Sequence, residues 1–173
     1  DNLVRHHDYS LAILESIRPY PMAKYWLHCH HLHVDGKKMS KSLGNIVYVE
    51  TIRNKGFTEQ EIRFFLINGH YRRKMNYRED RFRVSAEKLR MLRDRVRGIA
   101  KKARGTSQAG SETAGRVEAL FRSGMDDDLH VGRAIDDLSG LLAEKDRVGM
   151  TRGEASALLA SLQRIDRVLQ VLF

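Results

Sequence analysis

Two lysines three positions apart, Lys38 and Lys41, carry the pattern in this chain that most directly suggests chemistry. They lie in the run Lys38-Met39-Ser40-Lys41-Ser42, whose other residues are small or slim. Lysine is a compact cation on a flexible stem, so it can follow a phosphate that moves during a reaction. When ATP is cleaved between its α- and β-phosphates, cations beside the leaving pyrophosphate stabilise the transition state more than the ground state. The run therefore predicts a phosphate-handling loop, with a basic surface turn as the alternative.

The segments on either side of this lysine loop must position it. A helix is predicted over residues 8–17, where apolar residues recur every third position, and Pro19 and Pro21 follow its end. Residues 25–34 have aromatic and aliphatic residues at both ends and predict a strand. Asp35-Gly36 is a turn signal that leads from this strand directly into the loop.

The next segments predict two short helices and an extended stretch. Residues 47–54 read as a helix closed by Lys55-Gly56, with the glycine just beyond its end. Thr58 and Glu61 match a capping box at the start of a second helix, which ends at Gly69. Its apolar face is predicted to consist of Ile62, Phe65 and Leu66. Residues 70–77 are predicted to be extended.

The remainder of the chain predicts a helical bundle. A long amphipathic helix is expected over residues 78–103, followed by a flexible linker at 104–111. Further helices are expected at roughly 112–123, 130–148 and 151–171, the last with Thr151 as N-cap. The apolar stripe of the long helix is Phe82, Ala86, Leu89, Leu92, Val96 and Ile99, and that of the last helix is Leu158, Leu162, Ile165, Val168, Leu169 and Leu172. Asp126, Asp127 and Asp128 are expected to cap the helix that follows them, with a Mg²⁺ site as the alternative. The fold class is thus a short mixed α/β fragment followed by a mostly α-helical bundle.

Composition limits the classes of partner. The 173 residues include 31 Lys and Arg against 22 Asp and Glu, a net charge of +9, which favours a polyanion such as RNA. General surface charge, DNA and membrane headgroups remain alternatives. The single cysteine, Cys29, excludes an internal disulfide. No apolar run approaches the roughly 20 residues of a membrane span, so we expect a cytoplasmic protein with no membrane partner.

Several runs in the same order resemble the C-terminal half of the cysteinyl-tRNA synthetase family. They are His6-His7-Asp8, Tyr25-Trp26-Leu27-His28, Val34 to Asn45, Arg63-Phe64-Phe65-Leu66, His70-Tyr71-Arg72, Asn76-Tyr77, and Met125-Asp126-Asp127-Asp128-Leu129. The lysine loop matches the family's KMSKS motif. Ordered matches at family-like spacing are far more specific than the loop alone.

The resemblance implies three parts. Residues 1–46 would be the C-terminal part of a Rossmann-like catalytic domain, residues 47–78 a connecting module, and residues 79–173 a helical tRNA-binding domain. The implied reaction is adenylation of an amino acid, expected to be cysteine, by ATP with Mg²⁺, followed by transfer to tRNA. Lys38 and Lys41 would be the catalytic residues. The ATP-binding residues would be Lys38, Met39, Ser40, Lys41, Ser42 and His28.

The metal site of the family is only partly matched. There a zinc ion is bound in part by the first and last residues of a His-His-Glu-Asn-Glu segment, four positions apart on one helical face. Here His6 keeps the first position and Ser10 occupies the last, and serine is a poor zinc ligand. Zinc and the choice of amino acid therefore stay open. Cys29, His31 and His33, on one face of the predicted strand, are an alternative metal set.

The rest of the synthetase site is expected in an upstream segment. The family's HIGH motif, which acts on the ATP phosphates, is N-terminal to every residue matched here. An upstream catalytic half, on the same gene product or on another chain, is therefore an expected partner.

RNA contact is predicted at Arg72, Arg73, Lys74 and Arg78, which form a basic-aromatic stretch with Tyr71 and Tyr77; a solvated face is the alternative. Two other functions remain. One is a cysteine:amine ligase of the mycothiol type, which shares the adenylation step. The other is a tRNA-binding synthetase paralogue without activity, suggested by Ser10.

Overall fold

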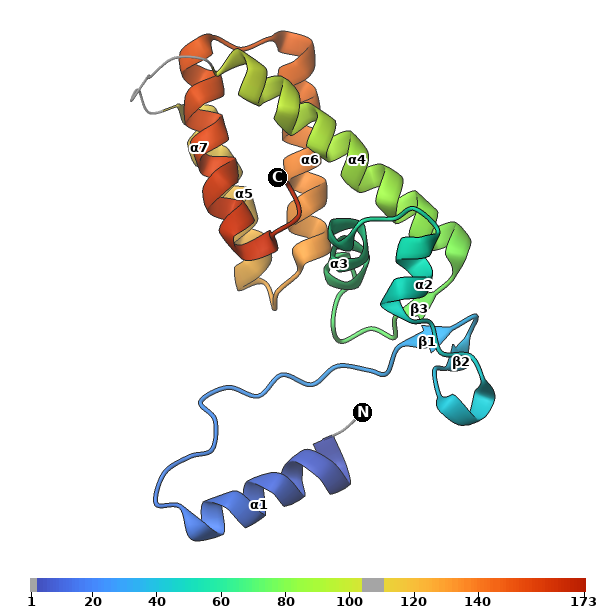
Figure 1. The fold of residues 1–173 in the computed structure, drawn as a ribbon. Coiled ribbons are helices and arrows are strands. Elements are labelled where there is room, and N and C mark those ends of the chain that lie inside the picture. Colours follow the sequence, from blue (N-terminus) through green and yellow to red (C-terminus); the bar gives the residue numbers. More distant parts are fainter. Residues whose placement is uncertain (1–2, 104–110) are drawn as a thin grey trace. The chain divides into compact units, whose positions relative to one another are not determined.

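The computed structural model describes residues 3–103 and 111–173 (Figure 1). Within them the chain forms seven α-helices and one small three-stranded sheet. The helices are α1 (Asp8–Ile17), α2 (Val49–Asn54), α3 (Glu59–Asn68), α4 (Glu79–Lys102), α5 (Glu112–Asp126), α6 (Val131–Val148) and α7 (Arg152–Leu169). The strands are β1 (His33–Val34), β2 (Lys37–Lys38) and β3 (Asn76–Tyr77). Residues 104–110 of the predicted linker lie outside the described residues.

The chain divides into two compact units. The first comprises Asp1–Val47 and Tyr71–Arg78, and contains α1 and the sheet; the second comprises Tyr48–His70 and Glu79–Phe173, and contains α2 to α7. The α/β fragment and the bundle expected from the sequence are thus both present, although the sheet is much smaller than a full α/β sheet. The predicted three-part division at residues 46 and 78 stays a prediction.

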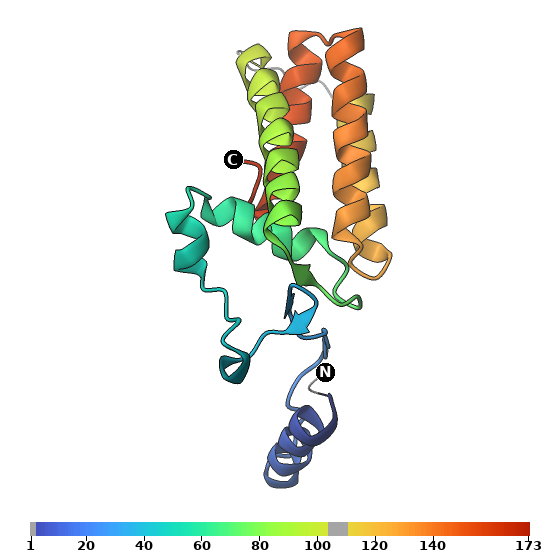
Figure 2. The same cartoon turned by 90° about the vertical axis from the view of Figure 1, so that its right-hand side faces the viewer.

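The core of the second unit lies between α4, α5, α6 and α7, which run side by side in both views (Figures 1 and 2). All six apolar positions predicted for α4 are buried, and they recur every three to four residues as a buried helical face requires. In α7 the predicted stripe is buried except for Val168, which is 52% exposed. The helix ends at Leu169, and Val171 and Leu172 continue into the core beyond it. Apolar periodicity therefore predicted this bundle correctly.

Backbone signals set the ends of α2 and α3. Gly56 lies just beyond Lys55, the C-cap of α2, with a φ of 87°, a conformation that glycine adopts without strain. Thr58 caps α3 and forms the predicted capping box with Glu61. The predicted apolar face of α3 is wrong in part, because Phe64 is fully buried whereas Leu66 is 46% exposed. The reason is that α3 packs against both α4 and α6, so its buried face is broader than one stripe.

Glu61 is buried although it carries a charge. Its Oε1 atom accepts a hydrogen bond from Arg90 Nε at 2.5 Å, and its Oε2 atom accepts one from the backbone N–H of Thr58 at 2.8 Å. Burial alone would raise the pKa of this carboxyl, but the hydrogen bonds from Arg90 and Thr58 outweigh that effect and lower the pKa. The pair therefore joins the start of α3 to the middle of α4 through a buried ionised group.

The aspartates at 126–128 do not cap the next helix, contrary to our prediction. Asp126 ends α5, and Asp128 and Leu129 adopt positive φ angles in the connection. The cap of α6 is His130, whose Nδ1 accepts from the Arg133 N–H. Because α6 begins only at Val131, the aspartates are too far upstream to reach its first N–H groups. Asp127 instead pairs with Arg133 at 2.7 Å.

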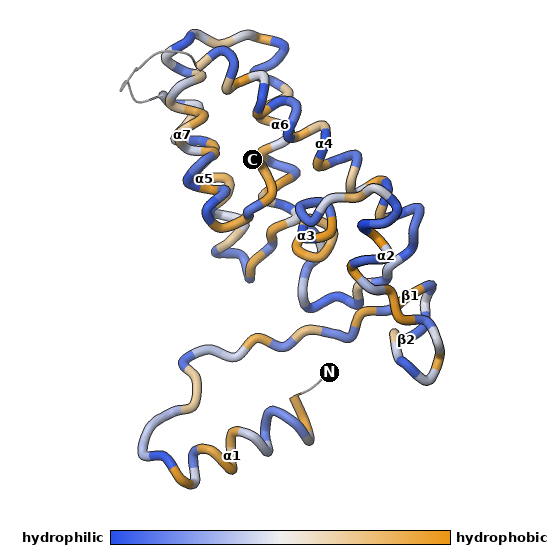
Figure 3. Tube along the Cα trace, viewed as in Figure 1, coloured by the Kyte–Doolittle hydropathy of each residue, from blue (hydrophilic) through white to orange (hydrophobic). Residues whose placement is uncertain are grey.

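In the first unit, α1 has the predicted bounds but none of its residues is buried. Figure 3 shows hydrophobic positions recurring along this helix. Ile13 and Ile17 are 64% and 73% exposed. The strand predicted over residues 25–34 is wrong except for its last two residues, and only Asn76–Tyr77 of the predicted extended stretch at 70–77 form a strand. Aromatic and aliphatic residues at both ends of a segment do not make a strand unless a neighbouring strand pairs with it, and in the described sheet the paired residues of this segment are His33 and Val34.

None of the helices in the described part of the chain combines the length and the apolar composition that a bilayer span requires.

Two glycines allow close helix contacts in the second unit, and one of them gives a test of the packing. A Cβ atom at Gly132, in the first turn of α6, would overlap the backbone carbonyl oxygen of Asn68. We expect Gly132→Ala to lower the free energy of unfolding by about 1–3 kcal/mol, because the backbone of α3 must shift. Urea unfolding measures the change.

Gly140→Ala is the matched control, because a Cβ at Gly140 on the same helix meets no atom within 4 Å. Since alanine favours a helix interior over glycine, this variant should gain about 0.5–1 kcal/mol. Equal effects of the two substitutions would contradict the close contact between α3 and α6.

Candidate functional site

The lysine loop directly follows the turn of a tight hairpin in the first unit. Strands β1 and β2 pair antiparallel, with His33 opposite Lys38 and Val34 opposite Lys37. Between them Asp35 and Gly36 have φ angles of 48° and 80°, as a two-residue hairpin turn with positive φ at both positions requires. The predicted Asp-Gly turn is therefore confirmed. The turn connects the buried Val34 to the exposed Lys37 and Lys38.

A single asparagine braces the loop. Asn45 Oδ1 accepts from the Ser40 backbone N–H at 2.9 Å, and Asn45 Nδ2 donates to the Lys38 carbonyl at 3.1 Å. Lys41–Leu43 form a turn of 3₁₀ helix that Gly44 closes in a left-handed conformation, with its N–H donating to the Lys41 carbonyl at 3.0 Å. The backbone on both sides of the two lysines is thus held by hydrogen bonds. The sequence run contained Asn45, but its bracing role was not predicted.

The loop presents its charges to solvent. Lys38 and Lys41 are exposed, whereas Met39 and Ser40 between them are half-buried. Neither ammonium group has an ion-pair or hydrogen-bond partner among the residues that the structure describes. Ser40 Oγ and Ser42 Oγ lie 3.2 Å apart. Two uncompensated cations on a braced backbone are suited to binding a polyphosphate.

One histidine lies close enough to the loop to respond to its charge. The pKa of the half-buried His31 is lowered, first by loss of hydration and next by the nearby Lys38 ammonium. A neutral imidazole at this place adds no charge, so the positive charge of the loop is that of its lysines.

The sheet brings the predicted RNA-binding stretch beside the hairpin. Strand β3 pairs with β1 in parallel, His33 against Asn76 and Val34 against Tyr77. Asn76 Oδ1 accepts from the Gly36 N–H in the turn at 2.8 Å, a contact between residues 40 positions apart. The four predicted RNA-binding residues, Arg72, Arg73, Lys74 and Arg78, flank this strand and are all exposed. Sequence spacing contains no signal for the pairing of these two segments.

The histidines near the N-terminus form a second cluster in the same unit. His7 Nδ1 lies 3.1 Å from His28 Nδ1, and the Trp26 and His28 rings are nearly parallel at 6.3 Å. The pKa of His7 is lowered, first by loss of hydration and then by His28 and His6. His28, predicted at the ATP site, therefore contacts His7, and this pairing was not predicted.

A zinc site does not follow from the described residues. No three of their His, Cys, Asp or Glu side chains are grouped so that they could hold a metal ion. His6 is exposed, and the residue one turn on is Ser10, which cannot supply a carboxylate. The alternative set of Cys29, His31 and His33 depended on a strand that is absent over residues 25–32, so that interpretation is wrong. We derive no chemical step through zinc.

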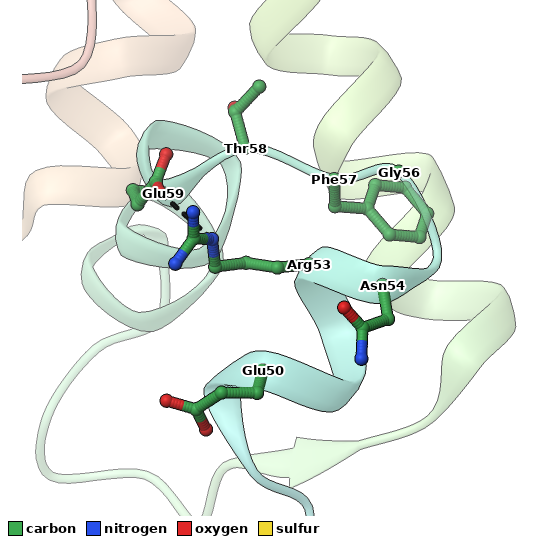
Figure 4. Close-up of a pocket in the computed structure, with 7 residues that line it drawn as sticks. All are labelled: Glu50, Arg53, Asn54, Gly56, Phe57, Thr58 and Glu59. Carbon is green, nitrogen blue, oxygen red and sulfur yellow. Dashed lines mark ion pairs between the residues drawn. The ribbon is translucent and has the colours of Figure 1, made fainter.

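A pocket of about 470 Å³ lies in the second unit where α2 turns into α3 (Figure 4). Its lining residues are Glu50, Arg53, Asn54, Gly56, Phe57, Thr58 and Glu59. Arg53 Nε is paired with Glu59 Oε1 at 2.9 Å, and both side chains are more than half exposed. Because this cation is already neutralised, we assign no chemistry to the pocket.

Comparison with known proteins gives consistent results along the chain. The family described as tRNA synthetases class I (C) catalytic domain matches residues 1–87. A curated relative named "Cysteine--tRNA ligase" from Chlamydia trachomatis serovar D is 32% identical over 189 residues, covering 99% of this chain and 40% of the relative. Relatives of the same name from Chlamydia caviae and Koribacter versatilis are 32% and 31% identical, covering 99% of this chain and 38% and 36% of their own lengths.

The chain spans about two fifths of the length of the curated relatives that it matches. The family match covers slightly more than half of the chain, from the histidine cluster through the lysine loop and into α4. The chain therefore belongs to the class I (C) tRNA synthetase family.

Proposed function

We propose that this chain supplies the C-terminal part of a cysteine–tRNA ligase. In the first step an amino-acid carboxylate oxygen attacks the α-phosphorus of ATP, and the bond to the β-phosphate breaks to release pyrophosphate. In the second step the terminal ribose hydroxyl of tRNA takes the acyl group, and AMP leaves. Residues 1–46 would complete a Rossmann-like catalytic domain with an upstream segment. The observation that carries the proposal is the braced loop with its two unpaired lysines.

Lys38 and Lys41 act in the first step by charge stabilisation. Negative charge grows on the β-phosphate oxygens as the bond breaks, and two ammonium groups at that place lower the barrier. Since Asn45 holds the loop backbone at Lys38 and Ser40, little reorganisation is needed when the charge develops. ATP brings Mg²⁺, which neutralises part of the phosphate charge. The chemistry requires orientation and cations, so no protein base is assigned.

Two features of the first unit support partners beyond ATP. The exposed basic residues of the stretch at 72–78 lie beside the hairpin and suit contact with the tRNA backbone. The exposed apolar residues of α1 suit contact with the upstream catalytic segment, because an apolar face in water is costly. We propose that this reaction takes place in the cytoplasm.

A second candidate function is a tRNA-binding paralogue without adenylation activity. The observation that favours it is Ser10, which stands where the family has a carboxylate. This candidate keeps RNA binding but loses selection of the amino acid. The same experiment separates the two functions.

Amino acid-dependent ATP–pyrophosphate exchange, with the upstream segment present, tests the ligase. We expect exchange with cysteine, and a loss of about 100- to 1,000-fold in Lys41→Ala because one transition-state cation is removed. Lys37→Ala is the matched control: this exposed lysine precedes the loop, and its loss should change the rate only a few-fold. No exchange with any amino acid, while tRNA still binds, would favour the inactive paralogue.

Asn45→Ala tests the brace. Each of its two hydrogen bonds is worth about 1 kcal/mol, so we expect exchange to fall roughly tenfold or more as the lysines lose their fixed positions. The thermal midpoint should change little, because the loop is exposed. Asn54→Ala, at an exposed asparagine on α2, is the control. An Asn45→Ala enzyme with full activity would refute the positioning role.

A further inference from the structure

A pocket of about 290 Å³ lies in the second unit between the start of α3 and the middle of α4. Its lining residues are Thr58, Glu61, Leu89, Arg90, Arg93, Asp94 and Arg97. The three arginines follow one another at spacings of three and four along α4, so they share one face of the helix. Three guanidinium groups therefore border one hollow together with two carboxylates.

Two of these arginines are already neutralised. Arg90 Nε is 2.5 Å from Glu61 Oε1, and Arg97 pairs with Asp94 at 2.7 Å. The Glu61 carboxylate is also fixed by the Thr58 N–H, so it cannot move to another cation. The charge that remains in the pocket is that of Arg93.

Arg93 lacks the partners that a buried cation normally has. The side chain is half-buried, and its Nε atom is buried without a hydrogen-bond partner among the described residues. Buried polar atoms are almost always hydrogen-bonded, and Arg93 is one of the residues that line the pocket, so its unsatisfied donor indicates a missing acceptor. The missing group should carry one negative charge, because one cation in the pocket is unbalanced.

We propose that Arg93 binds a phosphodiester group of an RNA backbone in this pocket. A phosphodiester carries a single negative charge, and its oxygens match the planar fork of a guanidinium. The net charge of +9 suits a polyanion, and membership of a tRNA synthetase family favours RNA over an acidic protein segment as the source. The proposal depends on the proposed function only in taking tRNA as the partner, and it adds a contact on the helical bundle to that function.

The salt dependence of tRNA binding tests this contact. Binding of the full chain to a tRNA transcript with the cysteine anticodon is measured by fluorescence anisotropy over a series of salt concentrations. We expect Arg93→Gln to weaken binding about tenfold. It should also reduce the slope of log K against log salt by about 1, because one phosphate contact is lost.

Arg95→Gln is the matched control. It removes the same charge from the same helix, but Arg95 is directed to Asp146 of α6 at 3.5 Å and does not line the pocket. Its slope should equal that of the parent. Arg93→Lys keeps the charge and loses the fork, so it should keep the slope while binding more weakly. Thermal unfolding verifies that each variant is folded. If Arg93→Gln does not fold, the tRNA affinity of Arg93→Lys tests the proposal by itself.

Two results would overturn the proposal. One is a salt slope for Arg93→Gln that equals the slope of the parent, or a tRNA affinity for folded Arg93→Lys that equals the affinity of the parent. The other is unchanged tRNA binding by Arg93→Gln together with lost binding of poly-glutamate, which would assign the pocket to an acidic polypeptide. Pyrophosphate exchange needs no tRNA and should be unaffected in these variants. If the parent shows no exchange but its tRNA binding still depends on Arg93, the ligase function is refuted and the Arg93 site is supported.

Discussion

The second unit depends on the burial of one helical face. Along α4 the six apolar residues from Phe82 to Ile99 are removed from water by α3, α6 and α7. A helix repeats every 3.6 residues, so fixing these six positions also fixes the direction of every other side chain on it. The arginines at 90, 93 and 97 must then lie together toward the start of α3. Core packing and the basic pocket thus follow from the same constraint.

The buried pair of Glu61 and Arg90 shows how the bundle accommodates charge near its core. A charge taken out of water is costly unless it is paired and hydrogen-bonded. Glu61 meets both conditions, and it keeps a lowered pKa despite its burial. Because Arg90 pairs with Glu61 and Arg97 with Asp94, neither carboxylate that lines the pocket is left to pair with Arg93. The capping of α3 and the free cation on α4 are therefore connected.

The first unit is organised on a different principle. Its chemistry rests on backbone hydrogen bonds more than on a core, since Val34 and Tyr77 are the buried apolar residues that hold the described part of its sheet together. Asn45 and Asn76 join the loop and the turn to the rest of the hairpin with short, directed contacts. The exposed isoleucines of α1 lack the cover that α4 has. This contrast fits the proposal that another segment of a synthetase completes the apolar faces of this unit.

The sequence by itself determined the helices, the N-caps at Thr58 and Thr151 and most of the core. Those features depend on local interactions: apolar periodicity in α4 and α7, and capping boxes at Thr58 and Thr151. It also determined the lysine loop, because the Asp-Gly turn is a local signal too. Tertiary structure decided which segments meet: β3 with β1, His7 with His28, and α3 with the middle of α4. It also decided that residues 25–32 are not a strand and that Arg93 Nε finds no hydrogen-bond partner in the part of the chain that the structure describes. These outcomes depend on contacts between residues far apart in sequence, which no local pattern encodes.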